Sequence, residues 1–232
     1  MNVDITMQTG NLTNTMANQN TAILKDKRRW TEILAAGITG LMKFALMDWL
    51  DMRALYIGAA CVFWLLFITK RHRENNHILK NWGFKKDHFK PTFLFLLPFA
   101  GVAVAAIIWY GISFNADFLN WHVIPVLILY PAWGMVQQFM MIGLVAGNLQ
   151  KISTLNLNEP QIVLITSLLF ALIHYPSLPL MAFAFFMEVL FTSVYFRWRN
   201  LWPLALYHGW VGSLFLFFVL GRDLWNELWP ML

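Results

Sequence analysis

The sequence predicts an all-α fold, namely a polytopic membrane bundle of about seven transmembrane helices within a range of six to eight. Hydrophobic residues make up 59% of the chain and charged residues only 12%, about half of the roughly 25% usual in soluble proteins. The apolar residues fall in blocks of about 20, which matches the thickness of a bilayer core. Strand-like alternation typical of outer-membrane barrels is not visible, so helices are expected to satisfy the backbone in lipid.

The expected elements divide the chain into three parts. The segment 1–30 is rich in Asn, Thr and Gln, so we expect a disordered polar tail with a basic flank. The transmembrane domain is predicted over 31–222, followed by a short amphipathic tail at 223–232. The fourth span is long enough to be tilted or broken near Pro125 and Pro131. The predicted spans are 31–50, 52–69, 91–112, 121–149, 160–175, 178–196 and 201–220.

Basic residues favour one orientation of this bundle. Fourteen of the 17 Lys and Arg residues fall on one side if the chain has seven spans and starts inside. The opposite loops hold only Arg53 and Arg222. The positive-inside rule therefore predicts a cytoplasmic N-terminus and an outside C-terminus. We expect the plasma (inner) membrane of a prokaryote, with the lipid bilayer as partner. Topology explains the basic surplus, so nucleic acid is not an expected partner.

Strongly polar side chains inside the spans are costly, and each one requires a partner. Gln137 and Gln138 are adjacent, so on a helix they point about 100° apart and cannot easily share one partner. The plainer interpretation is that both amides join neighbouring helices, at about 1 kcal/mol each. The other strongly polar residues singled out in the spans are His174, Glu188 and His208, with Lys43 as an outlier expected near the cytoplasmic leaflet.

His174, Glu188 and His208 are candidates for a catalytic centre. A single buried His is more often structural, but two on neighbouring hydrophobic hairpins make a functional role equally plausible. Glu188 would either be protonated and hydrogen-bonded across helices, or stay ionised beside a cation or metal. Two His and one carboxylate with an open position form a known catalytic zinc set, which makes His174, His208 and Glu188 candidate zinc ligands.

Taken in order, these residues resemble the motifs of the CPBP family, which comprises intramembrane proteases related to the CAAX prenyl endopeptidase and to bacteriocin-processing and immunity proteins. The family motifs are Glu-Glu-x-x-x-Arg, Phe-x-x-x-His and His-x-x-x-Asn. The resemblance covers roughly residues 81–218. The matching stretches here are Gln137-Gln138-Phe-Met-Met-Ile142, Phe170-Ala-Leu-Ile-His174 and His208-Gly-Trp-Val-Gly212.

This sequence departs from the family pattern at the residues that would carry the chemistry. The resemblance implies that the Glu pair activates water, while the His and Asn residues position it or stabilise an oxyanion. A Gln side chain cannot act as a general base near neutral pH. Ile142 replaces the Arg that would orient a carboxylate, and Gly212 replaces the Asn. Losing one such oxyanion donor costs about 3 kcal/mol in comparable sites.

Three functions follow as alternatives. The first, which we favour because both histidines are kept, is an intramembrane endopeptidase that hydrolyses a peptide bond near the membrane face. There Glu188 would act as acid and base, with His174 and His208 holding water or zinc. The second is a pseudoprotease that binds a membrane-embedded or lipidated protein segment without cutting it. The third is a transporter or structural protein in which the polar residues only join helices.

Overall fold

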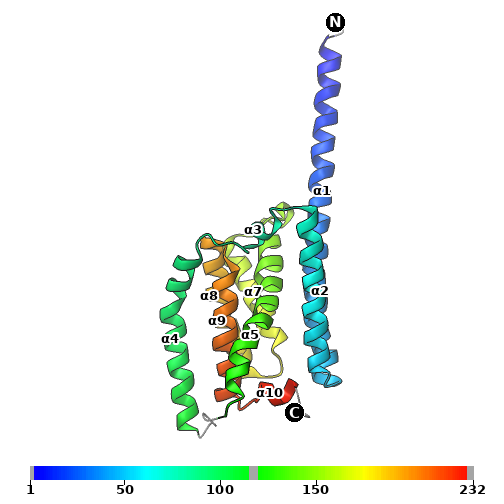
Figure 1. Ribbon diagram of the computed structural model, residues 1–232. Helices are drawn as coiled ribbons and strands as arrows, with labels where there is room; N and C mark the ends of the chain where they lie inside the picture. Colours follow the sequence, from blue (N-terminus) through cyan, green and yellow to red (C-terminus); the bar gives the residue numbers. More distant parts are fainter. Residues whose placement is uncertain (1–2, 115–119, 229–232) are drawn as a thin grey trace.

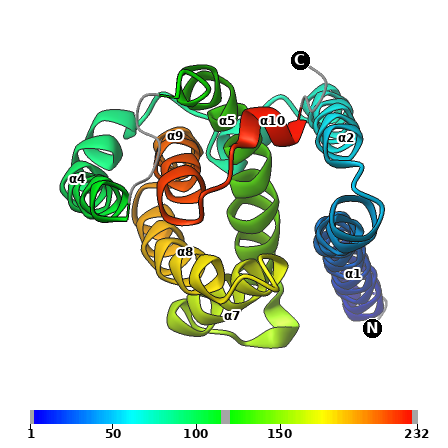
Figure 2. The same ribbon diagram turned by 90° about the horizontal axis from the view of Figure 1, so that it is seen from below.

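The computed structural model describes residues 3–114 and 120–228, with side chains described from Ile23 onward except that of Ser153. Secondary structure in these residues is helical (Figures 1 and 2), which confirms the all-α prediction. The elements are α1 (Val3–Lys43), η1 (Phe44–Trp49), α2 (Arg53–Glu74), α3 (Ile78–Trp82), α4 (Phe89–Ser113), α5 (Val123–Gln138), η2 (Phe139–Ala146), α6 (Gly147–Leu149), η3 (Ser153–Leu155), α7 (Glu159–Ile173), α8 (Leu178–Trp198), α9 (Leu201–Leu214), η4 (Phe215–Val219) and α10 (Leu224–Leu228).

Six helices in the described residues are long and apolar enough to cross a membrane, so the prediction of a polytopic membrane protein is confirmed. They cover Ile23–Trp49, Arg53–Glu74, Phe89–Ser113, Val123–Leu149, Leu178–Trp198 and Leu201–Val219. The remaining predicted span, 160–175, corresponds to α7, which has 15 residues. A helix of that length rises only about 22 Å, less than the roughly 30 Å of a bilayer core.

The two ends of the chain differ from the expectation of tails. The segment 1–30 was expected to be disordered, whereas α1 begins at Val3 and continues through it. Extending an existing helix backwards needs no new nucleus, and Asn, Thr and Gln each oppose it by less than about 0.7 kcal/mol. At the other end α10 occupies Leu224–Leu228, and the rest of the predicted amphipathic tail, 229–232, lies outside the described residues.

The irregularity in the fourth span lies further along than the prolines suggested. Helix α5 runs through Pro131 without ending. Instead the backbone changes to a π-helix, η2, directly after Gln138, and every residue of η2 is buried. Such π-segments are found mostly as local bulges, frequently at functional sites. The change of helix type rotates the buried residues that follow Gln138 relative to those before it.

Close packing of α5 against α9 sets the position of the polar residues. Gly209 on α9 lies against Pro131, and a Cβ at this glycine would overlap the proline backbone. Gly134, on α5 one turn after Pro131, makes a similar approach to α9. A Cβ added there would lie 3.0 Å from the Ala205 carbonyl oxygen. Small residues allow helices in lipid to approach closely, as they do here. The result is that the end of α5 lies directly against the middle of α9.

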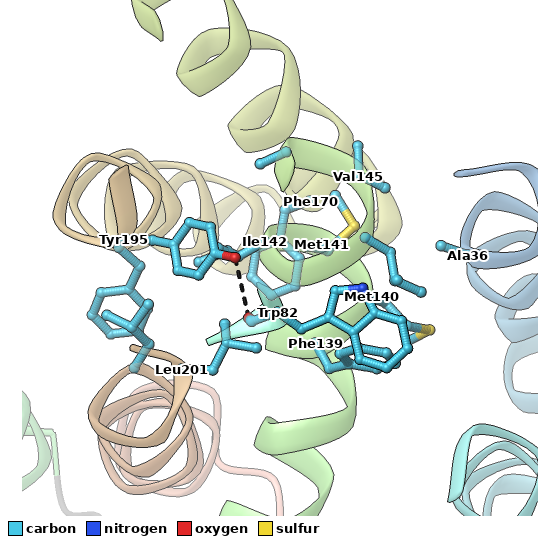
Figure 3. Close-up of a cluster of buried hydrophobic side chains, with 14 of the residues drawn as sticks. Ala36, Trp82, Phe139, Met140, Met141, Ile142, Val145, Phe170, Tyr195 and Leu201 are labelled. Atoms are coloured by element: carbon cyan, nitrogen blue, oxygen red, sulfur yellow. Dashed lines mark hydrogen bonds between the residues drawn. The ribbon is translucent and has the colours of Figure 1, made fainter. Parts of the chain in front are cut away.

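The main apolar core surrounds η2 and joins it to α3, α8 and α9 (Figure 3). Phe139 packs edge-on against Trp82, with ring centroids 5.0 Å apart. The Tyr195 hydroxyl donates a hydrogen bond to the Trp82 carbonyl at 3.1 Å, drawn as the dashed line in Figure 3. Ile142 and Leu201 are fully buried in the same cluster. This core fixes η2, and through it Gln138, relative to α8 and α9.

The loops that carry most of the basic residues meet at one end of the bundle. We call this the basic end; it comprises the segments 70–90, 150–158 and 197–200. Arg29 donates to the Lys151 carbonyl at 2.6 Å, and Asn200 donates to the Lys85 and Asp87 carbonyls at 2.8 Å each. Helix α10 lies at the opposite end, which we call the α10 end (Figure 1). The loops grouped by the positive-inside argument are therefore neighbours in space.

A buried ionic contact attaches α1 and α2 to the rest of the bundle near the basic end. Glu32 accepts hydrogen bonds from Arg71 at 3.0 and 3.3 Å and from the Asn148 amide at 2.9 Å. All three residues are buried. Nearer the α10 end, α1 and α2 stand apart from α8 and α9 on the far side of α5 (Figure 2). Between this contact and those of Lys43 and Arg53 near the α10 end, the pair bounds an interior space.

A polar cluster joins the start of α5 to α10 at the α10 end. His122 Nδ1 lies 2.5 Å from an oxygen of Asp223, and the Asn120 amide donates to the same oxygen at 3.2 Å. Asn226 adds two further hydrogen bonds, one from its backbone and one from its side chain. Burial raises the pKa of Asp223, but the hydrogen bonds from His122, Asn226 and Asn120 outweigh it and hold the pKa below 3.8. The carboxylate form of Asp223 therefore stabilises the docked α10.

Candidate functional site

The structure brings four of the five predicted polar residues into one hydrogen-bonded chain. His208 Nε2 lies 2.9 Å from Gln137 Oε1, and His208 Nδ1 lies 3.1 Å from Gln138 Nε2. Gln138 Nε2 also donates to Glu188 Oε2 at 3.0 Å. The expectation that the two amides could not easily share one partner was wrong, because the two nitrogens of the His208 imidazole each face one of them. The order along the chain is Gln137, His208, Gln138 and Glu188.

The order of donors and acceptors selects one tautomer of His208. An amide oxygen only accepts, so the ring nitrogen facing Gln137 Oε1 must carry the proton. The other nitrogen is then unprotonated and accepts from the Gln138 amide, as the geometry requires. A protonated, cationic imidazole would place two N–H groups face to face at that contact. The site therefore holds His208 neutral with its proton on Nε2.

Glu188 lies sealed within the bundle. Its carboxyl accepts from Gln138 and, at 3.4 Å, from the Thr192 hydroxyl one helical turn later. The residue has no exposed surface, and no Lys or Arg of the described chain forms an ion pair with it. Gln138 is equally buried, and its Oε1 has no hydrogen-bond partner. Two helices thus bury a carboxyl and an amide against each other.

The fifth residue, His174, stands apart from this chain. It caps the C-terminal end of α7, and its Nδ1 lies 2.7 Å from the Phe170 carbonyl oxygen. The Phe170 ring lies between the two histidines, with centroids 4.8 Å from His174 and 5.5 Å from His208. The Phe-x-x-x-His motif therefore places an aromatic ring, rather than a hydrogen bond, between the histidines.

A cavity of about 390 Å³ lies between the α1/α2 pair and the helices α5 and α7. Its size is within the range of ligand pockets, about 300–1,000 Å³. Gln137, His174 and Phe170 line it, whereas Gln138, His208 and Glu188 do not. Most of the remaining wall is apolar and comes from Ala36, Gly40, Ile57, Leu129, Ala132, Trp133, Met140, Met141 and Ile173. The polar chain thus touches the cavity only through Gln137.

The predicted zinc ligands do not fit a metal centre in this arrangement. No group of three His, Cys, Asp or Glu side chains in the described part of the chain is placed to hold a metal ion. Both nitrogens of His208 are engaged by amides, and His174 Nδ1 is engaged by a carbonyl. Glu188 lies on the far side of Gln138 from the cavity. We therefore derive no step of the chemistry through zinc.

The two other substituted motif positions supply no replacement polar group. Gly212, where the family has Asn, is buried on α9, and an added Cβ would meet only the edge of the Tyr130 ring at 4.0 Å. Ile142, where the family has Arg, is fully buried in the apolar core around η2. Neither position offers a charge or hydrogen-bond donor to the cavity.

Sequence reasoning missed the charged residues at the cavity mouth. Lys43, Asp48, Arg53, Arg222 and Glu227 all line the cavity at the α10 end. They lie in span ends and loops, where charged residues are ordinary, and only their grouping in space distinguishes them. The Glu32–Arg71 pair was also missed: Glu32 lies at the start of the predicted span 31–50, and Arg71 lies just beyond the span 52–69.

The helical bundle, with its polar side chains buried between spans, defines an integral membrane protein. A family model described as type II CAAX prenyl endopeptidase Rce1-like matches residues 90–214. This match covers more than half of the chain and includes all the motif positions, so the protein belongs to the CPBP family of CAAX-protease-related proteins. A search of curated proteins and a search of solved structures found no match.

Proposed function

We propose that this protein is a non-hydrolytic member of its family, which binds an apolar segment of a membrane-embedded or lipidated protein in the cavity without cutting it. One observation carries the proposal: Glu188, the carboxylate that could replace the missing Glu pair, is fully buried, bound to Gln138 and not part of the cavity wall. The family's carboxylate positions hold Gln137 and Gln138 instead.

Peptide hydrolysis needs a base within hydrogen-bonding reach of the attacking water, directly or through one further water. Gln137 reaches the cavity, but an amide does not accept a proton near neutral pH. His208 is held neutral with its unprotonated nitrogen turned to Gln138, away from the cavity. The acidic residues that do line the cavity, Asp48 and Glu227, belong to ion pairs at the mouth.

One observation favours the endopeptidase that the sequence first suggested. His174 lines the cavity and uses only Nδ1 in its contact with Phe170, which leaves Nε2 for a water molecule. For Glu188 to act with it, Gln138 would have to move aside and admit water to the interior. We therefore keep this second function as the alternative that the experiment must distinguish.

The test uses the whole protein in lipid nanodiscs with an internally quenched fluorescent peptide that ends in a prenylated Cys-x-x-x sequence. We expect saturable binding, measured by fluorescence anisotropy, with no increase in fluorescence from cleavage. Cleavage that disappears in His174→Ala and Glu188→Gln variants would overturn the proposal and support the altered protease. Elemental analysis belongs to the same experiment: stoichiometric zinc that is lost in a His174→Ala, His208→Ala double variant would contradict the metal-free site.

We further propose that the basic end faces the cytoplasm and the α10 end faces outside, in the plasma membrane. The grouping of the basic loops supports this orientation through the positive-inside rule. A cysteine introduced in place of exposed Lys86, in a Cys61→Ser background, should react with a membrane-impermeant thiol reagent only in inverted vesicles. Reaction in intact cells would reverse the proposed orientation.

A further inference from the structure

The cavity has an apolar inner part and a charged mouth, and this division restricts what can occupy it. Along α5 and the start of η2 its wall extends from Val126 to Met141, which corresponds to about 22 Å at the α-helical rise. The polar groups of the inner part are few, mainly Gln137 and His174. The hydroxyl of Tyr56, which also lines the wall, already donates to the Thr39 carbonyl at 2.9 Å.

A hydrocarbon chain fits this inner part better than an extended peptide does. Every residue of a peptide carries a backbone donor and acceptor, and each such group left unpaired in an apolar space costs free energy. The apolar wall formed by residues such as Ala36, Leu129 and Trp133 could not pair them. A hydrocarbon chain has no such groups and would fill the space through apolar contact alone.

The mouth at the α10 end is built from charged residues of separate elements. Lys43 Nζ lies 2.6 Å from Asp48 and also donates to the Tyr175 carbonyl at 2.9 Å. Arg222 forms two hydrogen bonds with Glu227, at 2.5 and 2.8 Å. The remaining charged residue of the mouth, Arg53, lies 3.9 Å from Glu227, which is too far for a hydrogen bond. Three cations thus face two anions among the residues that line the mouth.

These cations keep donors available for an incoming anion. An ammonium group has three donors, and Lys43 uses two of them. Arg53 makes only ion-pair contacts, at 3.3 Å to Asp51 and 3.9 Å to Glu227. Its side chain is 33% exposed, so a ligand can reach it. A negative charge at the mouth could accept from the free Lys43 donor and from Arg53, where it would compete only with Asp51, whose side chain is 77% exposed.

From this geometry we propose that the cavity takes a single-chain amphiphile with an anionic head, and that this ligand enters from the α10 end. The hydrocarbon chain lies between Gln137 and the mouth, and the head lies at Arg53 and Lys43. The inference rests on the proposed function in one respect, namely that the cavity is a binding site. It adds the chemical class of the occupant and the face of the membrane from which it comes.

The reactivity of Cys61 can test both the ligand class and the face of entry, because Cys61 is the only cysteine of the chain and lines the cavity on α2. The protein is placed in vesicles of each orientation and treated with a membrane-impermeant thiol reagent. Lys86→Cys, in a Cys61→Ser background, marks the basic end. We expect Cys61 to react from the side opposite to this marker. Reaction from the marker's side, or from neither side, would overturn entry at the α10 end.

The ligand class is tested by protection of Cys61 in nanodiscs. Oleate at ten times its dissociation constant should slow the reaction about tenfold, whereas oleyl alcohol, which lacks the charge, should need a higher concentration for the same effect. Arg53→Gln should raise the half-protecting concentration of oleate about two- to fivefold, as expected for a partly exposed charge. Arg73→Gln, the same change at the basic end, should leave it unchanged.

Each remaining outcome decides against one part of the inference. Equal protection by oleate and oleyl alcohol, or equal effects of Arg53→Gln and Arg73→Gln, would remove the anionic head. Protection by an uncharged hydrophobic peptide but not by oleate would make the occupant a peptide. Peptide cleavage by the protein would overturn the proposed function, while the sidedness and protection results would still decide this inference.

Discussion

Replacing Gln138 with Glu should test the buried contact between α5 and α8 most directly. Gln138 Nε2 lies 3.0 Å from Glu188 Oε2, so the new side chain would place a second carboxyl at hydrogen-bonding distance. With an effective dielectric constant of about 20, two ionised carboxylates at that separation repel by about 5 kcal/mol. The pair must therefore share one proton, and the Gln138→Glu protein should lose stability once the pH is high enough to remove it.

The assay is the thermal unfolding midpoint in one mild detergent at about pH 5 and about pH 9. Gln138→Glu should unfold at a clearly lower temperature at the higher pH. The double variant Gln138→Glu, Glu188→Gln restores one carboxyl and one amide, so it should lose the added pH dependence, although it also loses the amide donor to His208 Nδ1 and should be less stable than the parent. Gln137→Glu is the matched control, because Gln137 reaches the cavity and a carboxylate there can be hydrated.

Two results would refute this reasoning. The first is a Gln138→Glu protein with the same pH dependence as the parent, which would mean that the two side chains are not in contact. The second is a double variant no more stable than Gln138→Glu at the higher pH, which would mean that Glu188 does not carry the repelling charge. Destabilisation of all variants alike, including Gln137→Glu, would point to a general effect of charge in the bundle.

Three further perturbations test other contacts. Gly209→Ala should destabilise the protein by about 1–3 kcal/mol through overlap with α5, whereas Gly101→Ala, with open space around it, should be neutral or slightly stabilising in the same unfolding assay. Glu32→Gln should destabilise by about 1–3 kcal/mol, because it leaves buried Arg71 with only the partly exposed Glu74 as an anionic partner; an unchanged midpoint would show that the contact adds nothing. The lowered pKa of Asp223 means that its contribution to stability is present above about pH 3.8 and is lost as the pH falls through the lower folded-state pKa. Asp223→Asn should therefore remove the acid-induced release of α10, measured by limited proteolysis, and unchanged acid release would contradict this role.

The fold class could be predicted from the sequence because length and apolarity act locally. A block of about 20 apolar residues requires a helix in lipid whatever its neighbours are. Helix α7 is the element for which apolarity alone did not predict a helix long enough to span the membrane. The predicted span 160–175 is largely apolar, but the helix begins at Glu159, with Pro160 in its first turn, and the turn after His174 ends it. Its length, rather than its composition, separates it from the other spans.

The candidate site could be predicted as a set of residues but not as an arrangement. The cost of burying polar groups in lipid singled out Gln137, Gln138 and His208, and in the structure their side chains form hydrogen bonds between α5 and α9. Their partners depend on the rotation of α5, α8 and α9, which is set by the Gly209–Pro131 contact and by the π-helix η2. Neither the Gly209–Pro131 contact nor the π-helix produces a periodic pattern in the sequence. The zinc hypothesis failed to fit because residue types alone could not show that His174 faces the cavity while Glu188 does not.

The short rise of α7 also has a consequence for the lipid around the protein. Its 15 residues rise about 8 Å less than the thickness of a typical hydrocarbon core. A short segment is accommodated by local thinning of the bilayer, at a cost of fractions of a kcal/mol per ångström. We therefore expect the bilayer beside α7 to be thinner than elsewhere around the protein, which would bring the lipid surface closer to the cavity wall at Ile173 and His174.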